Sequence, residues 1–307
     1  MKKLLIIVLV VIGLLLVTGA GIFYFAPGIL VAGIQSSAAK ATGLEELTTE
    51  IDGYTVHYYR GGQGPPLVLL HGMGDEKNSF VQAAQSLAKG HTIILPDLQG
   101  HGKNTRASGR DYSIGGHVAF MEKFFADLRL EKFVLGGNSM GGHISAAYTL
   151  ARPEQVERLI LVNAPGLKLD DHIVYAGFGK KMESREDFDA VMSRVVHTPP
   201  ELPGPVVDFM IDKANEDFDF INQLAASVRK GPDYDLKERV QEISVPTLIL
   251  WGEKDQVVKF NVAEGYDSLI PSSDLVILEN AGHSPQLEKP KEVGEAIANF
   301  LDGGDTD

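Results

Sequence analysis

The sequence predicts an α/β protein with a mostly parallel central sheet flanked by helices. Short apolar runs alternate with longer helical patterns beyond about residue 50, as is typical of parallel strands joined by helical crossovers. Several of these runs are apolar throughout, which indicates strands buried on both faces. The composition, 44% hydrophobic and 22% charged, is that of a globular protein.

Seven segments are predicted as strands. Residues 67–70 are the clearest, because this continuous apolar run ends at a His-Gly turn. The others are residues 55–60, 92–95, 132–135, 158–162, 247–251 and 275–278. No strand is evident between residues 162 and 247, where residues 167–243 have the pattern of several short helices. We expect this stretch to be a helical cap insertion over the carboxyl edge of the sheet, where open α/β sheets bind ligands.

The chain is expected to divide into a large α/β domain and an N-terminal membrane segment. The predicted parts are an N-terminal transmembrane anchor or uncleaved signal at 1–25, a membrane-proximal connector at 26–49, a core at 50–166 and 244–302, the cap at 167–243 and a tail at 303–307. The connector is either an amphipathic segment on the membrane surface or a disordered linker, and the sequence leaves both open.

The N-terminal segment contains 22 uncharged residues between Leu4 and Phe25. At about 1.5 Å per residue, a helix of this length spans about 33 Å, which is enough for a hydrocarbon core of about 30 Å. Lys2 and Lys3 precede the run, so the positive-inside rule predicts a cytoplasmic N-terminus and a periplasmic or extracellular catalytic domain. The alternative is a signal peptide cleaved near Ala20, followed by secretion. A retained anchor is favoured, because the apolar run continues past that position.

Charge and cysteine content exclude several kinds of partner and chemistry. The 28 basic and 41 acidic residues give a formal charge of 28 − 41 = −13, which argues against nucleic-acid binding. With no cysteine in the chain there is no disulfide, thiolate nucleophile or cysteine-ligated zinc. The chemistry must come from other side chains.

A nucleophilic serine is predicted directly after the strand at 132–135. Gly137-Asn138-Ser139-Met140-Gly141 matches G-x-S-x-G, in which a sharp turn between a strand and a helix exposes the serine hydroxyl. A pattern of small residues typical of a tightly packed helix follows the motif. This context favours a functional serine over an ordinary glycine-rich turn.

A serine hydroxyl needs a base, and that base needs an acid to orient it. Each of the last two predicted strands is followed by a suitable residue, Asp255 after the first and His283 after the second. Glu253 and Glu279 are alternative acids, but Glu253 lies too close to the strand end and Glu279 precedes the histidine loop. The predicted catalytic residues are therefore Ser139, Asp255 and His283.

Acyl transfer also requires donors for the oxyanion, and backbone amides can supply them. The amide of Met140, which follows the serine, is one candidate. The amide of Met73, in His71-Gly72-Met73-Gly74 after the strand at 67–70, is the other. His143 is expected to be a packing or hydrogen-bonding neighbour of the serine, and Asp97 is expected to brace a loop through backbone hydrogen bonds.

Residues from about 50 to 301 together resemble an α/β-hydrolase. The matching segments are His71 to Gly74, Asp97 to Gly102, Gly136 to Gly142, Trp251 to Asp255 and Gly282-His283, and the order serine, acid, histidine is also that of the family. Within it, the chain is similar to bacterial lipases and membrane-anchored monoacylglycerol lipases. The resemblance implies the α/β-hydrolase fold and hydrolysis of lipid carboxylic esters by a Ser/His/Asp mechanism without metal or organic cofactor. Met73 departs from the bulkier residue of many relatives, but its role uses the backbone.

The predicted function is a membrane-anchored serine carboxylic-ester hydrolase that acts on lipid esters of the monoacylglycerol type. The many apolar residues of the predicted cap favour a lipid or small-molecule ester as the partner, because some of them are expected to line an acyl pocket. Two alternatives remain open. One is another serine-elbow reaction, as in perhydrolases, carbon–carbon bond hydrolases and acyltransferases, and the other is a non-catalytic lipid-binding protein. The sequence predicts neither the acyl chain length, the head group nor the oligomeric state.

Overall fold

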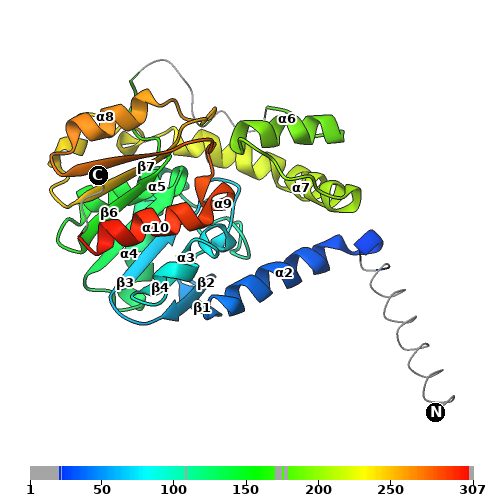
Figure 1. Cartoon of the computed structure of the whole chain (residues 1–307), viewed down its shortest axis with the longest axis horizontal. Helices are drawn as coiled ribbons and strands as arrows, with labels where there is room; N and C mark the ends of the chain where they lie inside the picture. The colour runs from blue at the N-terminus through cyan, green and yellow to red at the C-terminus, as the bar shows by residue number, and fades with distance from the viewer. Residues whose placement is uncertain (1–20, 22, 108, 170–174, 176–178, 304–307) are drawn as a thin grey trace, which may run out of the picture.

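A computed structural model describes residues 21, 23–107, 109–169, 175 and 179–303 (Figure 1). Eight strands form one sheet in the order β1-β2-β4-β3-β5-β6-β7-β8. Their bounds are β1 (Leu44–Ile51), β2 (Tyr54–Gly62), β3 (Pro66–Leu70), β4 (Thr92–Pro96), β5 (Phe133–Asn138), β6 (Val156–Val162), β7 (Thr247–Gly252) and β8 (Ser273–Leu278). Strands β3 to β8 pair in parallel, whereas β2 is antiparallel to both β1 and β4.

Helices cover both faces of this sheet (Figure 1). The described α-helices are α2 (Pro27–Ala41), α3 (Ala84–Leu87), α4 (Ile114–Asp127), α5 (Met140–Ala151), α6 (Arg185–Val195), α7 (Gly204–Val228), α8 (Asn261–Leu269), α9 (Pro285–Glu288) and α10 (Pro290–Leu301). The described residues also form three 3₁₀ turns, η1 (Lys77–Phe80), η2 (Pro232–Tyr234) and η3 (Val240–Glu242).

Two apolar cores lie on the two faces of the sheet. Successive residues of β3 alternate between them, with Val68 and Leu70 packed in one cluster and Leu67 and Leu69 in the other. The first cluster includes buried residues of α4, α5 and α8, and the second includes residues of α3 and α10. This alternation explains why the central strands are apolar throughout, because each face of the strand meets a helical layer.

The seven predicted strands are all present, and the predicted fold class is confirmed. The strand β1 was not predicted, so the expectation that the sheet begins beyond residue 50 is wrong. Its sequence, Leu-Glu-Glu-Leu-Thr-Thr-Glu-Ile, has no apolar run, and its six central residues are exposed or half-buried. Asp52 and Gly53, both with positive φ, form the turn into β2. As an edge strand, β1 has only one neighbour and can remain polar.

The stretch between β6 and β7 contains helices and no strand among its described residues. The expectation of several short helices is wrong for α7, which has 25 residues. Pro203-Gly204-Pro205 marks its start, as expected from a proline in the first helical turn. Arg106 on the loop after β4 forms a two-pronged ion pair with Asp217 of α7, in which Nη2 and Oδ2 are 2.7 Å apart. The end of α6 contacts the loop after β8, because the amide of His283 donates to Val195 O at 2.9 Å.

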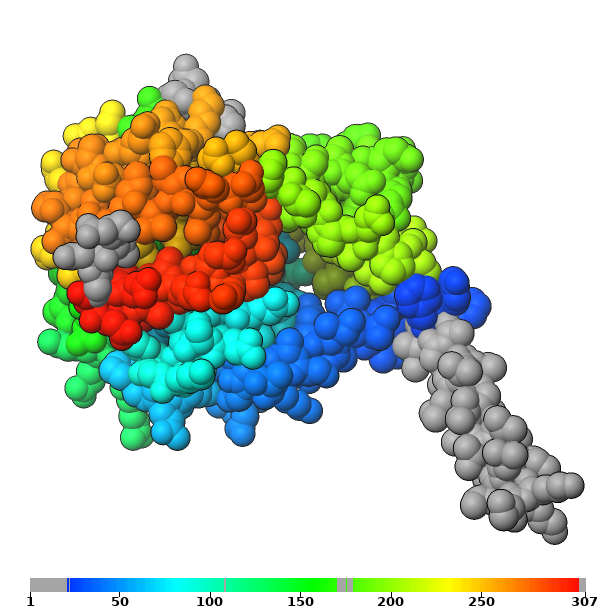
Figure 2. Space-filling view, in the orientation of Figure 1, coloured from blue at the N-terminus to red at the C-terminus, as the bar shows by residue number. Residues whose placement is uncertain are grey.

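Residues 27–41 of the predicted connector form α2, so this part of it is not a disordered linker. Figure 2 shows α2 in blue meeting α7. The contact involves the N-terminal part of α7, because a Cβ on Gly28 would lie 2.7 Å from the ring of Phe209. Most of the predicted anchor, residues 1–20 and 22, lies outside the described residues. Among the helices that are described, none is both long and apolar enough to cross a membrane.

Candidate active site

Ser139 occupies a strained backbone position between β5 and α5. Its φ of 52° and ψ of −121° are unfavourable for a side chain larger than glycine's. The glycines on either side allow the sharp turn. A Cβ on Gly137 would lie 2.5 Å from the carbonyl carbon of Gly141, and one on Gly141 would lie 2.3 Å from Leu70 O. The turn therefore has the close packing that the G-x-S-x-G pattern predicts.

The Ser139 backbone is held by hydrogen bonds on both sides. Its amide donates to Val162 O at 2.9 Å, and its carbonyl accepts from the amide of His143 at 3.0 Å. The neighbouring Asn138 side chain donates from Nδ2 to Val162 O at 3.2 Å and to His283 O at 2.9 Å. Asn138 thus connects the serine turn directly to the loop that carries the candidate base.

His283 and Asp255 form a buried hydrogen-bonded pair. Nδ1 of His283 is 2.8 Å from Oδ2 of Asp255, and the two side chains are 7% and 1% exposed. The other carboxylate oxygen, Oδ1, accepts from the amides of Val257 at 2.7 Å and Val258 at 3.0 Å. Because an ionised carboxylate only accepts hydrogen bonds, the pair places the imidazole proton on Nδ1 and leaves Nε2 with a free lone pair.

The two alternative acids lie elsewhere. The exposed Glu253 side chain accepts from Lys254 Nζ at 2.9 Å and from the amide of Asn280 at 3.1 Å. The Lys254 hydrogen bond is the main cause of its lowered pKa. Glu279 is exposed at the end of β8. The structure therefore pairs His283 with Asp255 and not with either glutamate.

The loop after β3 lies against the serine turn. A Cβ on Gly72 would be 3.3 Å from Ser139 Cβ. His71 holds this loop, because Nε2 accepts from the amide of Leu98 at 3.0 Å and Nδ1 donates to Gly72 O at 2.7 Å. A trans peptide directs its C=O and the following N–H to opposite sides. Fixing the Gly72 carbonyl therefore also fixes the direction of the Met73 N–H.

Met140 is the first residue of α5, so its amide belongs to the helix turn whose N–H groups have no carbonyl partner within the helix. Such amides carry the positive end of the helix dipole. Gly72 thus lies beside the Ser139 turn, and Met140 follows Ser139 directly, so the two residues predicted as oxyanion donors are next to this turn in space or in sequence.

His143 and Asp97 have the structural contacts that were expected of them. His143 is fully buried, with Nδ1 2.9 Å from Tyr175 Oη and Nε2 2.9 Å from Asp233 O. Burial lowers its pKa to about 4. Asp97 is buried and accepts from the amide and Nζ of Lys77 and from the amide of Lys103. Asp97 therefore braces the loops after β3 and β4.

Sequence reasoning missed Asn163 at the end of β6. Its Nδ2 donates to Asp255 Oδ2 at 2.7 Å, and its Oδ1 accepts from the amide of Gly252 at 3.1 Å. Its φ of 46° is in the left-handed region that asparagine tolerates better than most residues. A polar residue directly after an apolar strand was the available signal, since β6 ends at the carboxyl edge of the sheet.

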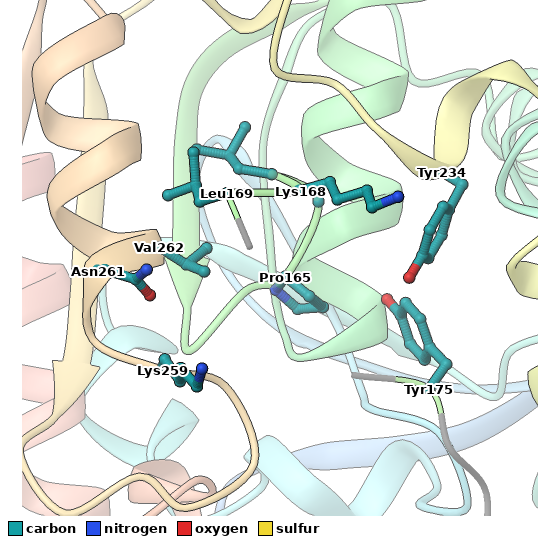
Figure 3. Close-up of a pocket in the computed structure, with 10 residues that line it drawn as sticks. Pro165, Lys168, Leu169, Tyr175, Tyr234, Lys259, Asn261 and Val262 are labelled. Atoms are coloured by element: carbon teal, nitrogen blue, oxygen red, sulfur yellow. The ribbon is translucent and has the colours of Figure 1, made fainter. Parts of the chain in front are cut away.

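A small pocket opens behind the loop that follows β6 (Figure 3). Its lining includes Pro165, Leu169 and Val262, and the hydroxyls of Tyr175 and Tyr234 point toward one another at one side of it. Its volume of about 30 Å³ has room for ordered water but not for an acyl chain. Across the described part of the chain, no group of three or more histidine or acidic side chains is arranged to hold a metal ion.

Residues 65–190 and 208–290 match the family model described as the alpha/beta hydrolase fold. The chain belongs to the α/β-hydrolase family. This α/β-hydrolase is 30% identical over 260 residues to lipase 3 of Moraxella sp. (strain TA144), covering 78% of each chain. It is also 29% identical over 258 residues to monoacylglycerol lipase ABHD6 of Mus musculus, covering 79% of this chain and 77% of the relative.

Solved structures resemble the α/β-hydrolase over most of its length. The crystal structure of a membrane phospholipase A, described as a novel bacterial virulence factor, superposes with a TM-score of 0.85 at 30% identity, and the match covers 99% of both chains. A putative lipase from Acinetobacter baumannii has a TM-score of 0.79 at 23% identity, covers 89% of this chain and 95% of its own, and shows the fold alone. These similarities identify a lipase-like or esterase-like α/β-hydrolase.

Proposed function

We propose that the protein is a membrane-anchored serine carboxylic-ester hydrolase that acts on lipid esters, with monoacylglycerols as the preferred class. Ser139 is the nucleophile, His283 the base and Asp255 the acid of this proposal. The observation that carries it is the 2.8 Å bond from His283 to Asp255, tied through Asn138 to the strained Ser139 turn. A histidine–carboxylate pair with only a structural role would not need a hydrogen-bonded connection to a strained serine turn.

In the first half of the reaction, Nε2 of His283 takes the proton from the Ser139 hydroxyl as Oγ attacks the ester carbonyl. The amides of Met73 and Met140 donate to the oxyanion of the tetrahedral intermediate, and such donors are each worth roughly 3 to 4 kcal/mol of barrier. His283 then returns the proton to the leaving alcohol. The products of this half are the free alcohol and an acyl ester on Ser139.

In the second half, His283 takes a proton from water as the water oxygen attacks the acyl ester. The second tetrahedral intermediate collapses, the Ser139 oxygen regains the proton, and the fatty acid leaves. Asp255 orients the imidazole through Nδ1 and stabilises its protonated form in both halves. Atoms balance with water as the only co-substrate, so the proposed reaction needs no metal or cofactor.

Two lines of support favour a lipid ester as the substrate. The relatives are named lipases, monoacylglycerol lipases and a phospholipase A. The long helix α7 also carries large apolar side chains that are only half-buried, namely Phe209, Met210, Phe218 and Phe220. Apolar side chains of this kind suit an acyl chain, because aliphatic substrates gain affinity by leaving water.

The proposed membrane anchor rests on the uncharged run from Leu4 to Phe25. Its last residues, Tyr24 and Phe25, are 64% and 91% exposed, and aromatic residues are enriched at membrane interfaces. With Lys2 and Lys3 before the run, the anchor places the hydrolase on the outer side. A reporter fused to the C-terminus tests this orientation, since activity confined to the cytoplasmic side contradicts it.

The proposed function is tested by hydrolysis of short-, medium- and long-chain monoacylglycerols, with a diacyl phospholipid in parallel. The detergent-solubilised full chain and its Ser139→Ala variant are measured side by side. The proposal predicts turnover of monoacylglycerols by the wild type and none above background by the variant. Faster turnover of the phospholipid would change the substrate class, and a folded but inactive wild type would overturn the assignment.

A further inference from the structure

The loop that carries His283 is tightly enclosed. On one side lies the end of β7, where a Cβ on Gly252 would be 2.0 Å from Gly282 O. On the other side lies the segment after α6, where a Cβ on Gly282 would be 2.7 Å from the amide nitrogen of His197. The loop therefore cannot shift in either direction without moving one of these neighbours.

The end of α6 is bonded directly to this loop. Val195 is the last residue of α6, so its carbonyl has no partner within the helix. That carbonyl instead accepts from the amides of His283 at 2.9 Å and Ser284 at 3.2 Å. In addition, Nε2 of Gln256, next to Asp255, donates to Ser193 O at 3.4 Å. The last turn of α6 thus contacts the loops of both the base and the acid.

Glu288, the last residue of α9, adds a second connection between the His283 loop and the segment after α6. Its Oε1 accepts from the amide of Gly282 at 2.7 Å, on the histidine loop. Its Oε2 accepts from the amides of His197 at 2.8 Å and Thr198 at 3.4 Å, on the segment after α6. One carboxylate therefore joins the two segments through backbone N–H groups, and hydrogen bonds to a charged acceptor are about twice as strong as neutral ones.

We infer that Glu288 is a positioning residue, which clamps the His283 loop to the end of α6. The end of α6, which belongs to the helical insertion, therefore helps to fix the position of the base His283. The inference rests on the proposed function. It follows that the α6 end is not a freely moving lid, because its displacement would leave the Val195 carbonyl and the loop amides of His283 and Ser284 without partners. Substrate entry must then involve another part of the insertion.

Breaking the clamp is expected to lower kcat and to leave KM nearly unchanged. A displacement of about 1 Å at a reacting group can lower the rate about 100-fold, and Glu288 sets the position of His283 without contacting substrate. We therefore expect Glu288→Gln to lower kcat about 10- to 100-fold on a soluble short-chain ester, with KM within about twofold of the wild type. Glutamine preserves the shape of the side chain but replaces one acceptor oxygen with a donor that faces amide N–H groups.

The matched control is Glu295→Gln, which removes the same charge from an exposed side chain on α10 that pairs with Lys291 and with no other cationic side chain in the described part of the structure. Both variants are measured as full chains in detergent, with Tm recorded to establish folding. Unchanged kcat in a folded Glu288→Gln protein overturns the inference, as does an equal loss in the control. Should the glutamine variant not fold, Glu288→Asp, which keeps the charge on a shorter side chain, is judged by the same criteria.

A spectroscopic readout keeps this test independent of the proposed reaction. The proton on Nδ1 of His283 is hydrogen-bonded to Asp255 and gives a downfield ¹H NMR resonance, which is assigned by its loss in His283→Gln. The clamp predicts that this resonance shifts or broadens in Glu288→Gln and is unchanged in Glu295→Gln. If the wild type hydrolyses no ester, the proposed function fails, but an unchanged resonance in Glu288→Gln is what refutes the clamp.

Discussion

Asn163 donates a hydrogen bond from Nδ2 to Oδ2 of Asp255 at 2.7 Å, the same oxygen that is bonded to Nδ1 of His283. Its Oδ1 at the same time accepts from the amide of Gly252 at the end of β7. Asn163 thus fixes the candidate acid to two adjacent strand ends. The carboxylate has no freedom to rotate away from the histidine without losing this bond and those from Val257 and Val258.

Replacing Asn163 with alanine is expected to lower kcat about 10-fold or more, because the acid loses one of the bonds that orient it. Stability is also expected to fall by about 1–2 kcal/mol, from the lost hydrogen bonds and the positive φ. Steady-state kinetics and thermal unfolding give the two values. Asn280→Ala is the control, because Asn280 has a φ of 53° at an exposed position. Equal loss of kcat in both variants would refute the role of Asn163.

His71 is expected to act through the Gly72–Met73 peptide. His71→Phe removes the shorter of two hydrogen bonds to the Gly72 carbonyl and leaves the one from the Asp75 amide at 3.3 Å. We therefore predict a kcat decrease of about 10- to 100-fold, less than or equal to the effect of losing one oxyanion donor. His71→Asn keeps a side-chain donor near Gly72 O and should retain more activity. Binding of a boronic acid, which mimics the tetrahedral intermediate, should weaken in parallel. Normal binding in His71→Phe would show that Met73 is positioned by other contacts.

His117 on α4 is fully buried, and neither ring nitrogen has a hydrogen-bond partner among the described residues. Burial lowers its pKa from 6.5 to about 3. The unfolded chain therefore binds a proton that the folded protein does not, and the folded state loses about 1 kcal/mol for each pH unit as pH falls from 6.5 toward 3. Above pH 6.5 this penalty is absent.

Replacing His117 with leucine should remove the penalty. We predict a gain of about 1 kcal/mol near neutral pH from avoiding an unsatisfied polar group, and a larger gain at pH 5. Denaturant unfolding of wild type and His117→Leu at both pH values provides the measurement, with His91→Leu at a half-buried position as the control. If the stability gain of His117→Leu is no larger at pH 5 than near neutral pH, the predicted link between His117 protonation and stability is contradicted.

The ion pair between Arg106 and Asp217 holds α7 to the loop after β4, and the guanidinium also lies 5.2 Å from the ring of Phe220. Because the pair is partly exposed, Arg106→Gln should cost no more than about 1 kcal/mol of stability. If the proposed function is correct, Arg106→Gln should change KM several-fold for long-chain esters and change it little for short-chain esters. Asp217→Asn should reproduce this effect, and a loss of the same size for all chain lengths would contradict it.

Local patterns account for the parts of the fold and site that could be predicted. The Ser139 turn depends on glycines within two residues of it, and the strands around it are apolar because both faces are covered. The edge strand β1 has no such pattern, because most of its side chains face solvent. The breaks at Pro199-Pro200 and Pro203-Gly204-Pro205 predict short helices, but they lie before or at the start of α7, and no proline follows Pro205 within its 25 residues.

The supporting residues could not be predicted because they act through tertiary contacts. Asn163 lies 92 residues from Asp255, and Glu288 lies 91 residues from His197. The position of Asn163 directly after an apolar strand is the one local signal, and it does not show that the side chain contacts Asp255. Predicting them requires the positions of strand ends and helix ends in space, which only the assembled sheet provides.

In the proposed mechanism, Ser139 is a nucleophile activated by His283 and Asp255. The most direct test of this mechanism is the rate of labelling by a fluorophosphonate, followed by mass spectrometry of the intact chain and of its peptides. We expect one probe per chain on Ser139, none on Ser139→Ala, and labelling of Asp255→Asn slower by about 10³- to 10⁴-fold. Labelling of Ser139→Ala at the wild-type rate, or of Asp255→Asn as fast as wild type, would contradict the mechanism.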